Sequence, residues 1–155
     1  MIFIFLFILC LIFFGLCFLG TGTDEKNLKN YMSYPDEVQE KIKNIEDYHG
    51  KCKASTFVAN FIVFSILFLI LGLKIRQESF VQNFIAILIL GQGLNVFDLV
   101  FIDLLWWRNT NRIRFSKIPE KSLYQNPKKH IEAFERALLM YFLIALLDAY
   151  ILTLF

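Results

Sequence analysis

Four polar side chains recur along an apolar stretch of this sequence, and two of them are carboxylates. Asp98 and Asp103 are the only ionisable residues in Phe80–Trp107. Gln92 and Asn95 precede them, and on an α-helix all four fall within an arc of about 140°. A carboxylate in hydrocarbon is costly, so it turns toward protein or water and often marks a proton, ion or substrate site. We therefore expect these side chains to point into a helical bundle.

Three further polar residues extend this expected intramembrane cluster. Asp148 and Tyr141 are seven residues apart on one face of the last apolar stretch, and Asn60 lies in the second one. By the helical rise, Asp103, Asn60 and Tyr141 lie about 7 Å inside the same membrane boundary. Asp148 lies deeper, near the middle of the membrane.

The two deep carboxylates have no cationic side chain within the spans to pair with. An unpaired ionised aspartate is implausible in hydrocarbon. We therefore predict that at least one of Asp98 and Asp148 is protonated, binds a cation, or accepts hydrogen bonds from Asn95 and Gln92.

A second set of residues could bind an anion at the membrane surface. The segment 108–135 is rich in basic residues and follows the third apolar stretch. Basic clusters beside a membrane helix can capture a lipid headgroup or a phosphorylated ligand. The simpler interpretation is that these charges only orient the protein. The candidates for an anionic-headgroup site are Arg108, Arg112, Arg114, Tyr124 and His130.

No catalytic residue, cofactor or metal site is predicted. His49 and Cys52 have a spacing seen among metal ligands, but two ligands do not make a site. The sequence also lacks a glycine-rich phosphate loop, a nucleophile elbow and the paired aspartates of a prenyl transferase.

The elements that must position these residues are four membrane-spanning helices. Hydrophobic residues make up 57% of the chain and charged residues only 19%, which is far from the composition of a soluble domain. Spans of about 20 apolar residues must be helical, because lipid satisfies no backbone hydrogen bonds. We predict an all-α membrane protein with a single domain, 1–155, in which four helices form a bundle. The expected spans are 2–19, 56–73, 80–107 and 136–155.

Charge predicts how these spans are oriented. The segments 20–55 and 108–135 carry most of the lysines and arginines, whereas the connection between the second and third spans carries only Lys74 and Arg76. The positive-inside rule places both long segments in the cytoplasm and both termini outside, in a plasma membrane. Trp106 and Trp107 are expected at the boundary with the lipid headgroups.

The first span has an alternative interpretation as a cleaved signal peptide. Gly20 and Gly22 would suit a cleavage site, yet no positive charge precedes Lys26. We favour a retained span and leave its cleavage open.

Two helices are expected in the polar segments. After Pro35, the residues Val38, Ile42 and Ile45 recur at helical spacing, which predicts a short amphipathic helix. Its mixed charge favours packing on protein over binding to anionic lipid. The sequence Asn126-Pro127 predicts the start of a helix that continues to the C-terminus.

The third span is longer than a membrane requires. As a continuous helix it measures about 42 Å, against a hydrocarbon core of about 30 Å. It can tilt to fit, or it can break at Gly91–Gly93 and expose backbone groups, as transporters do at ion sites. We favour a continuous, tilted helix.

Several short motifs resemble small bacterial membrane proteins of unassigned activity. They are Tyr34-Pro35-Asp36-Glu37-Val38-Gln39, Phe97-Asp98, Asp103-Leu104-Leu105-Trp106-Trp107, and Lys129-His130 followed by a helix. The resemblance implies a four-span architecture and no particular reaction.

Three functions remain open. The first is a small transporter or complex subunit whose carboxylates bind a proton, a cation or a partner helix, with a homo-oligomer or a membrane-protein partner expected. The second is a membrane-surface enzyme or lipid binder that uses Asp103, Arg112, Arg114, Tyr124 and His130. The third is structural packing within a larger complex. The lipid bilayer is a partner in all three, and nucleic acid in none.

Overall fold

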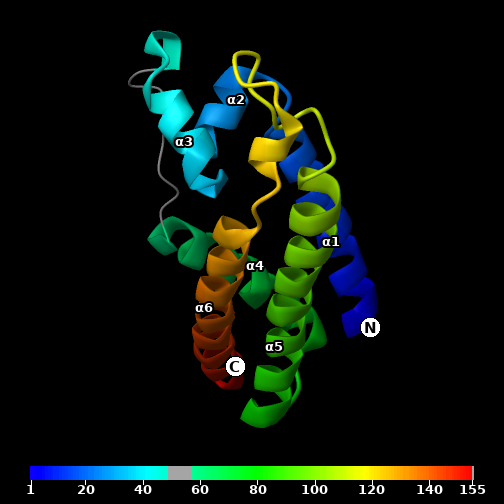
Figure 1. The fold of residues 1–155 in the computed structure, drawn as a ribbon. Coiled ribbons are helices and arrows are strands. Elements are labelled where there is room, and N and C mark those ends of the chain that lie inside the picture. The colour runs from blue at the N-terminus through cyan, green and yellow to red at the C-terminus, as the bar shows by residue number, and fades with distance from the viewer. Residues whose placement is uncertain (49–56, 155) are drawn as a thin grey trace. The chain divides into compact units, whose positions relative to one another are not determined.

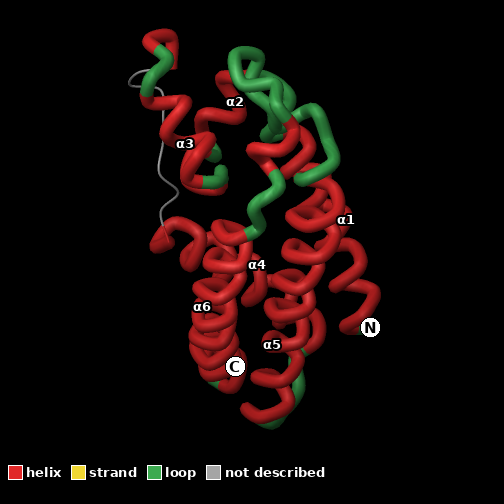
Figure 2. The backbone as a smooth tube through the Cα atoms, viewed as in Figure 1, coloured by secondary structure: helices red, strands yellow, loops and turns green. Residues whose placement is uncertain are grey.

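The described part of the chain consists of helices and the loops between them. The computed structural model describes residues 1–48 and 57–154. The predicted pair of His49 and Cys52 lies outside the described residues. Figure 2 shows helices and loops but no strand, and the only strand-like pairing in the described ranges is the bridge Phe115–Ile118. The all-helical prediction is confirmed.

Four of the helices are long and apolar enough to cross a membrane. They are α1 (Ile2–Leu19), α4 (Phe57–Ile75), α5 (Phe80–Phe97) together with its continuation to Trp107, and α6 (Lys128–Thr153). The start of α6 agrees with the prediction from Asn126-Pro127, since the side-chain oxygen of Asn126 accepts a hydrogen bond from Lys128 N at 3.0 Å. The last apolar span therefore continues a helix whose first turns are polar.

The chain folds as two compact units. The helical unit comprises Met1–Ile12, Thr56–Phe97 and Phe134–Phe155. The loop-rich unit comprises Phe13–Ser55 and Asp98–Ala133. The single domain predicted over the whole chain stays a prediction.

Glycines let the helices of the helical unit approach closely. A Cβ atom on Gly91 of α5 would lie 2.9 Å from the Cβ of Tyr141 on α6, and one on Gly93 would lie 2.7 Å from a methyl group of Leu6 on α1. Helix α4 meets α6 through the rings of Phe64 and Tyr141, whose centroids are 5.3 Å apart. The four helices thus pack against one another in this unit, where small residues permit close contact (Figure 1).

The outward faces of these four helices are apolar. In water such a surface would be far larger than monomeric proteins tolerate, whereas acyl chains would cover it without cost. The large exposed side chains include Phe3, Ile4 and Phe7 on α1, Val58, Ile62, Val63, Ile66 and Ile70 on α4, Val81 and Ile85 on α5, and Leu139, Phe142, Leu143, Leu146 and Leu147 on α6.

The third apolar stretch is continuous, but its winding changes at Asp98. Helix α5 passes through Gly91–Gly93 without a break and continues as a π-helix, η3 (Asp98–Trp107). The sequence predicted α-helical winding throughout, which would separate Asp98 from Asp103 by about 140° around the axis. In a π-helix the N–H of a residue bonds the carbonyl five positions earlier, so residues five apart lie one above the other. The π-helix therefore places both carboxylates on one face.

The loop-rich unit has its own hydrophobic core. Around it lie α2 (Asp24–Lys29), η1 (Tyr31–Ser33), α3 (Asp36–Lys43), η2 (Glu46–Tyr48) and η4 (Lys121–Tyr124). Val38 and Ile42 of α3 are fully buried, so the amphipathic helix packs on protein as predicted. The core is formed by Leu28, Tyr31, Tyr34, Val38, Ile42, Tyr48, Trp107, Ile113, Phe115, Ile118 and Tyr124.

Both tryptophans pack against other side chains of the loop-rich unit. Trp107 was expected at the lipid headgroups, but it is only 6% exposed and belongs to this core. Trp106 packs on Phe14 and Phe18, with ring centroids 5.5 and 6.3 Å away. The Trp107 ring lies 5.3 Å from the ring of Tyr34 and 5.4 Å from that of His130, between centroids, so it faces protein; the position of both tryptophans relative to a membrane stays a prediction.

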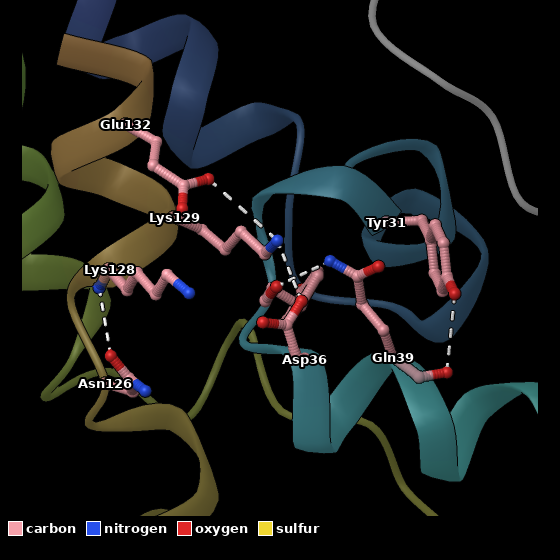
Figure 3. A network of polar contacts seen from close by, with 8 residues as sticks. Tyr31, Asp36, Gln39, Asn126, Lys128, Lys129 and Glu132 are labelled. Carbon is pink, nitrogen blue, oxygen red and sulfur yellow. Dashed lines mark hydrogen bonds and ion pairs between the residues drawn. The ribbon is translucent and has the colours of Figure 1, made fainter. Parts of the chain in front are cut away.

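Polar contacts join α3 to the first turns of α6 within this unit (Figure 3). Lys129 Nζ lies 2.8 Å from Asp36 Oδ1 and 3.9 Å from Glu132 Oε2. The hydrogen bond from Lys129 lowers the pKa of the Asp36 carboxyl. Gln39 Nε2 donates to the Tyr34 carbonyl at 2.8 Å. Because Asp36 is exposed, we assign this network a role in orienting α3 and not in stabilising the fold.

Asp24 links three segments of the loop-rich unit. Its carboxyl accepts hydrogen bonds from Tyr48 Oη and Ser116 Oγ, both at 2.5 Å, and from Ser116 N at 3.0 Å. Partial burial would raise the pKa of this carboxyl, but the hydrogen bonds from Ser116 and Tyr48 outweigh it, so the pKa is lowered.

This lowered pKa predicts an acid-sensitive contribution to stability. Because Asp24 ionises more easily in the folded state than in the unfolded chain, its contribution is present above about pH 4 and is lost as the pH falls through the folded pKa. Since the carboxyl is only partly buried and remains within reach of solvent, we expect Asp24→Asn to cost at most about 1 kcal/mol at pH 7 and less at pH 3. Hydrogen exchange of the loop-rich unit at both pH values measures this. Glu25→Gln, at the exposed neighbouring position, is the control, and an equal cost of Asp24→Asn at both pH values would contradict the assignment.

Candidate proton-binding sites

Among the described residues of the helical unit, one carboxyl group is buried, that of Asp148 on α6. The residue is fully buried, and its Oδ1 accepts a hydrogen bond from Ser65 Oγ of α4 at 2.7 Å. Its Oδ2 is buried too and has no hydrogen-bond partner among the described residues. Ile144 and Leu152, one turn away on either side, are also buried. Asp148 thus lies in an apolar interior with a single donor.

Such surroundings favour the neutral form of a carboxyl group. An ionised carboxylate needs several donors or a cation to replace the water that it loses on burial. Ser65 supplies one hydrogen bond, and the second oxygen receives none from any residue that the structure describes. This arrangement suits a carboxylic acid that holds a proton better than it suits a buried anion.

Gln92 and Asn95 connect α5 to α6 instead of serving the carboxylates. Gln92 Nε2 donates to the Leu138 carbonyl at 2.9 Å, and Asn95 Nδ2 donates to the Phe134 carbonyl at 3.3 Å. They point into the helical unit as predicted, but their partners are backbone groups. Side-chain amides commonly join membrane helices in this way.

The other two predicted members of the cluster, Tyr141 and Asn60, differ in their burial. Tyr141 is buried in the helical unit, with its ring 5.3 and 5.6 Å from those of Phe64 and Phe68. Asn60 is exposed in the first turn of α4, so it does not share the buried interior. The presence of a polar side chain at position 60 did not indicate which face of α4 packs against the other helices.

A second acid–base site lies in the loop-rich unit. His130 Nδ1 is 2.9 Å from Asp103 Oδ1, and the side chains are 5% and 13% exposed. The Trp107 ring lies edge-on to the imidazole, with centroids 5.4 Å apart. The sequence analysis grouped Asp103 and His130 with Arg112, Arg114 and Tyr124 in one candidate membrane-surface site, but no local signal could have shown that these two side chains contact each other.

Asp98 belongs to this second site and not to the surroundings of Asp148. It lies in the loop-rich unit, and its carboxyl interacts electrostatically with that of Asp103. Cys17 of α1 is within electrostatic reach of both. The predicted intramembrane cluster is therefore divided between the two units.

Arg112 is engaged within the chain. Its Nη2 donates to the carbonyls of Phe18 and Thr21, both at 3.0 Å, and its guanidinium carbon lies 3.8 Å from the centre of the Phe18 ring. Gly22, with φ +106°, makes room for it, because a Cβ there would lie 2.7 Å from Arg112 Nη2. Arg112 thus neutralises the carbonyl end of α1, a role that the sequence analysis missed.

The other members of the predicted headgroup site also differ in their surroundings. Tyr124 is buried, and its hydroxyl donates to the Ile118 carbonyl at 2.7 Å and accepts from Phe115 N at 3.1 Å. Burial raises the pKa of Tyr124 to about 12. Arg108 has a buried Nε without a hydrogen-bond partner among the described residues, and Arg114 is half-buried.

The chain matches no protein-family model, no curated protein and no solved structure. Among the described residues, no group of three or more His, Cys, Asp or Glu side chains could hold a metal ion. The fold therefore defines only a class, an all-helical chain with four helices long and apolar enough to span a membrane. The resemblance to small four-span bacterial proteins stays a prediction.

Proposed function

We propose that the chain is a multi-pass integral membrane protein that binds a proton at Asp148, as a small transporter or a subunit of a membrane complex. The observation that carries the proposal is the full burial of Asp148, with one oxygen bonded to Ser65 and the other without a partner among the described residues. A carboxyl group is seldom retained at such a cost unless it has a role.

A proton fits this site better than a metal cation does. Hard cations take about six or more oxygen ligands, or about four nitrogen and sulfur ligands if they are softer. Asp148 and Ser65 together offer two side-chain groups. A proton needs only one carboxyl oxygen and leaves the other free to accept from Ser65.

Infrared spectroscopy of the protein in lipid vesicles tests the proposal. We expect a carboxylic-acid C=O band at neutral pH that is missing in Asp148→Asn. Ser65→Ala should shift the same band, because the carbonyl oxygen loses its hydrogen-bond donor. Glu37→Gln, on the exposed face of α3, is the control and should leave the band unchanged. A spectrum that Asp148→Asn does not alter at neutral pH would refute proton binding there.

We also propose an orientation and an assembly. The concentration of basic residues in 20–55 and 108–135 supports placing both segments in the cytoplasm and both termini outside a plasma membrane. Four helices leave little room for an enclosed transport path, which supports a homo-oligomer or a larger complex. Native mass spectrometry in mild detergent would report copies, partners and bound lipids together.

Binding of an anionic headgroup is less well supported. Arg112 and Tyr124 form contacts within the chain, which leaves fewer free donors for a phosphate. Loss of a co-purified anionic lipid in an Arg112/Arg114 double variant would nevertheless favour this function.

A further inference from the structure

We propose that the connection between α4 and α5 binds a small zwitterion, a molecule that carries both an anionic oxyacid group and an ammonium group. A pocket of about 390 Å³ lies there, and it is lined by Arg76, Gln77, Glu78 and Gln82. The pocket belongs to the helical unit but shares no residue with the Asp148 site, so the inference goes beyond the proton binding proposed above.

A buried side chain holds this connection in place. Asn83 of α5 is 1% exposed, its Oδ1 accepts a hydrogen bond from Gln77 N at 2.8 Å, and its Nδ2 donates to the Gln77 carbonyl at 2.9 Å. Gln77 Nε2 in turn donates to the Ile75 carbonyl at 3.0 Å. The backbone that carries Arg76 and Glu78 is therefore fixed before a ligand arrives. Such preorganisation lowers the entropic cost of binding.

The pocket offers two opposite charges that do not pair with each other. Arg76 and Glu78 both border it, and neither forms an ion pair with any residue that the structure describes. A guanidinium group binds a phosphate or carboxylate through two parallel hydrogen bonds, and a carboxylate accepts hydrogen bonds from an ammonium group. A ligand that brings both groups would satisfy both side chains.

A ligand with only one kind of charge fits this pocket less well. Glu78 would repel a simple anion such as phosphate, and Arg76 would repel a simple cation. The amide of Gln82 supplies a donor and an acceptor, which also suits a ligand that has both. The volume falls within the range of small-molecule sites, roughly 300–1,000 Å³. Because all four lining residues are polar or charged, the ligand is expected to be small and polar.

Two sources can supply this chemistry. The connection joins two helices of membrane-spanning length, so in a bilayer it would lie at the level of the lipid headgroups. There, an ethanolamine headgroup presents a phosphate and an ammonium group. A free amino acid presents a carboxylate and an ammonium group. The lipid source rests on the proposed insertion into a membrane, whereas neither source rests on the protonation of Asp148.

Native mass spectrometry of the whole protein in mild detergent tests the lipid source. With equal amounts of phosphatidylethanolamine and phosphatidylglycerol of the same acyl chains, we expect the ethanolamine lipid to be bound preferentially. Arg76→Gln and Glu78→Gln should each weaken its binding about three- to tenfold, because each variant loses one charge-assisted contact. Glu78→Gln should also strengthen the binding of phosphatidylglycerol, because the repulsion between the carboxylate and the anionic lipid is removed.

Saturation-transfer NMR with free alanine as the probe tests the other source. If the ligand is a free amino acid, the protein should give an alanine signal that Arg76→Gln and Glu78→Gln both remove, and it should show no preference between the two lipids. Lys74→Gln and Glu135→Gln, at exposed charges of the helical unit outside the pocket, are the matched controls and should change neither measurement.

The substituted side chains are all exposed, so the thermal midpoint of each variant should equal that of the unchanged protein. The absence of both the lipid preference and the alanine signal would overturn the proposal. So would a preference or signal that the control variants reduce as much as the pocket variants do. The infrared band of Asp148 should be the same in all of these variants, so the two proposals can fail separately.

Discussion

Tyr34→Ala is expected to destabilise the loop-rich unit by about 3–5 kcal/mol, the range for removing a buried aromatic ring. Tyr34 is fully buried, and its ring centroid lies 5.0 Å from that of Phe115 and 5.3 Å from that of Trp107. Its hydroxyl donates to the Ile113 carbonyl at 2.9 Å. Truncation would open a cavity among these rings and leave a buried carbonyl without its donor. Hydrogen exchange of the amides of α3 in mild detergent measures the loss.

Two variants separate the causes of this effect. Tyr34→Phe keeps the ring and removes only the hydroxyl, so we expect it to cost about 1–3 kcal/mol through the unsatisfied Ile113 carbonyl. Tyr150→Ala, at an exposed tyrosine of α6, should leave the exchange of α3 unchanged. Unaltered protection of α3 in Tyr34→Ala would show that Tyr34 does not hold this core together.

Gly91→Ala is expected to destabilise the helical unit by about 1–3 kcal/mol, and Gly91→Leu by more. The added Cβ would lie 2.9 Å from the Cβ of Tyr141 and 3.0 Å from its Cγ. These atoms are close to the backbone of α6, so they cannot move without shifting the helix. The amide bonds of Gln92 and Asn95 to the carbonyls of α6 would be stretched by such a shift. At roughly 2–4 °C for each kcal/mol, the thermal midpoint in detergent should fall by several degrees.

Gly15 provides a matched control in α1. A Cβ at Gly15 would have no atom within 4 Å, so Gly15→Ala should leave the stability unchanged or raise it by about 0.5–1 kcal/mol. Equal thermal midpoints for Gly91→Ala and Gly15→Ala would mean that α5 and α6 do not approach as closely as the structure shows.

The positions of the helices could be predicted from the sequence alone. Runs of apolar residues are local features, and the helices α1, α4, α5 and α6 follow from them. Helix α3 and the start of α6 were predicted because Pro35 and Asn126-Pro127 are local signals. The inward direction of Gln92 and Asn95 followed from the cost of burying a polar group in lipid.

The contacts between side chains that are distant in the sequence could not be predicted and are known from the folded structure. Tyr34 bonds Ile113 and Asp103 meets His130 across long separations in the chain, and no periodicity encodes such pairs. The π-helical winding could not be predicted either, because the assignment of residues to helix faces used the rotation per residue of an α-helix. The sequence predicted Arg112 as a ligand for a headgroup, whereas in the structure it donates hydrogen bonds to the carbonyls of Phe18 and Thr21 at the end of α1. One cause explains all of these cases: the energy of a buried polar group depends on partners that folding brings from elsewhere in the chain.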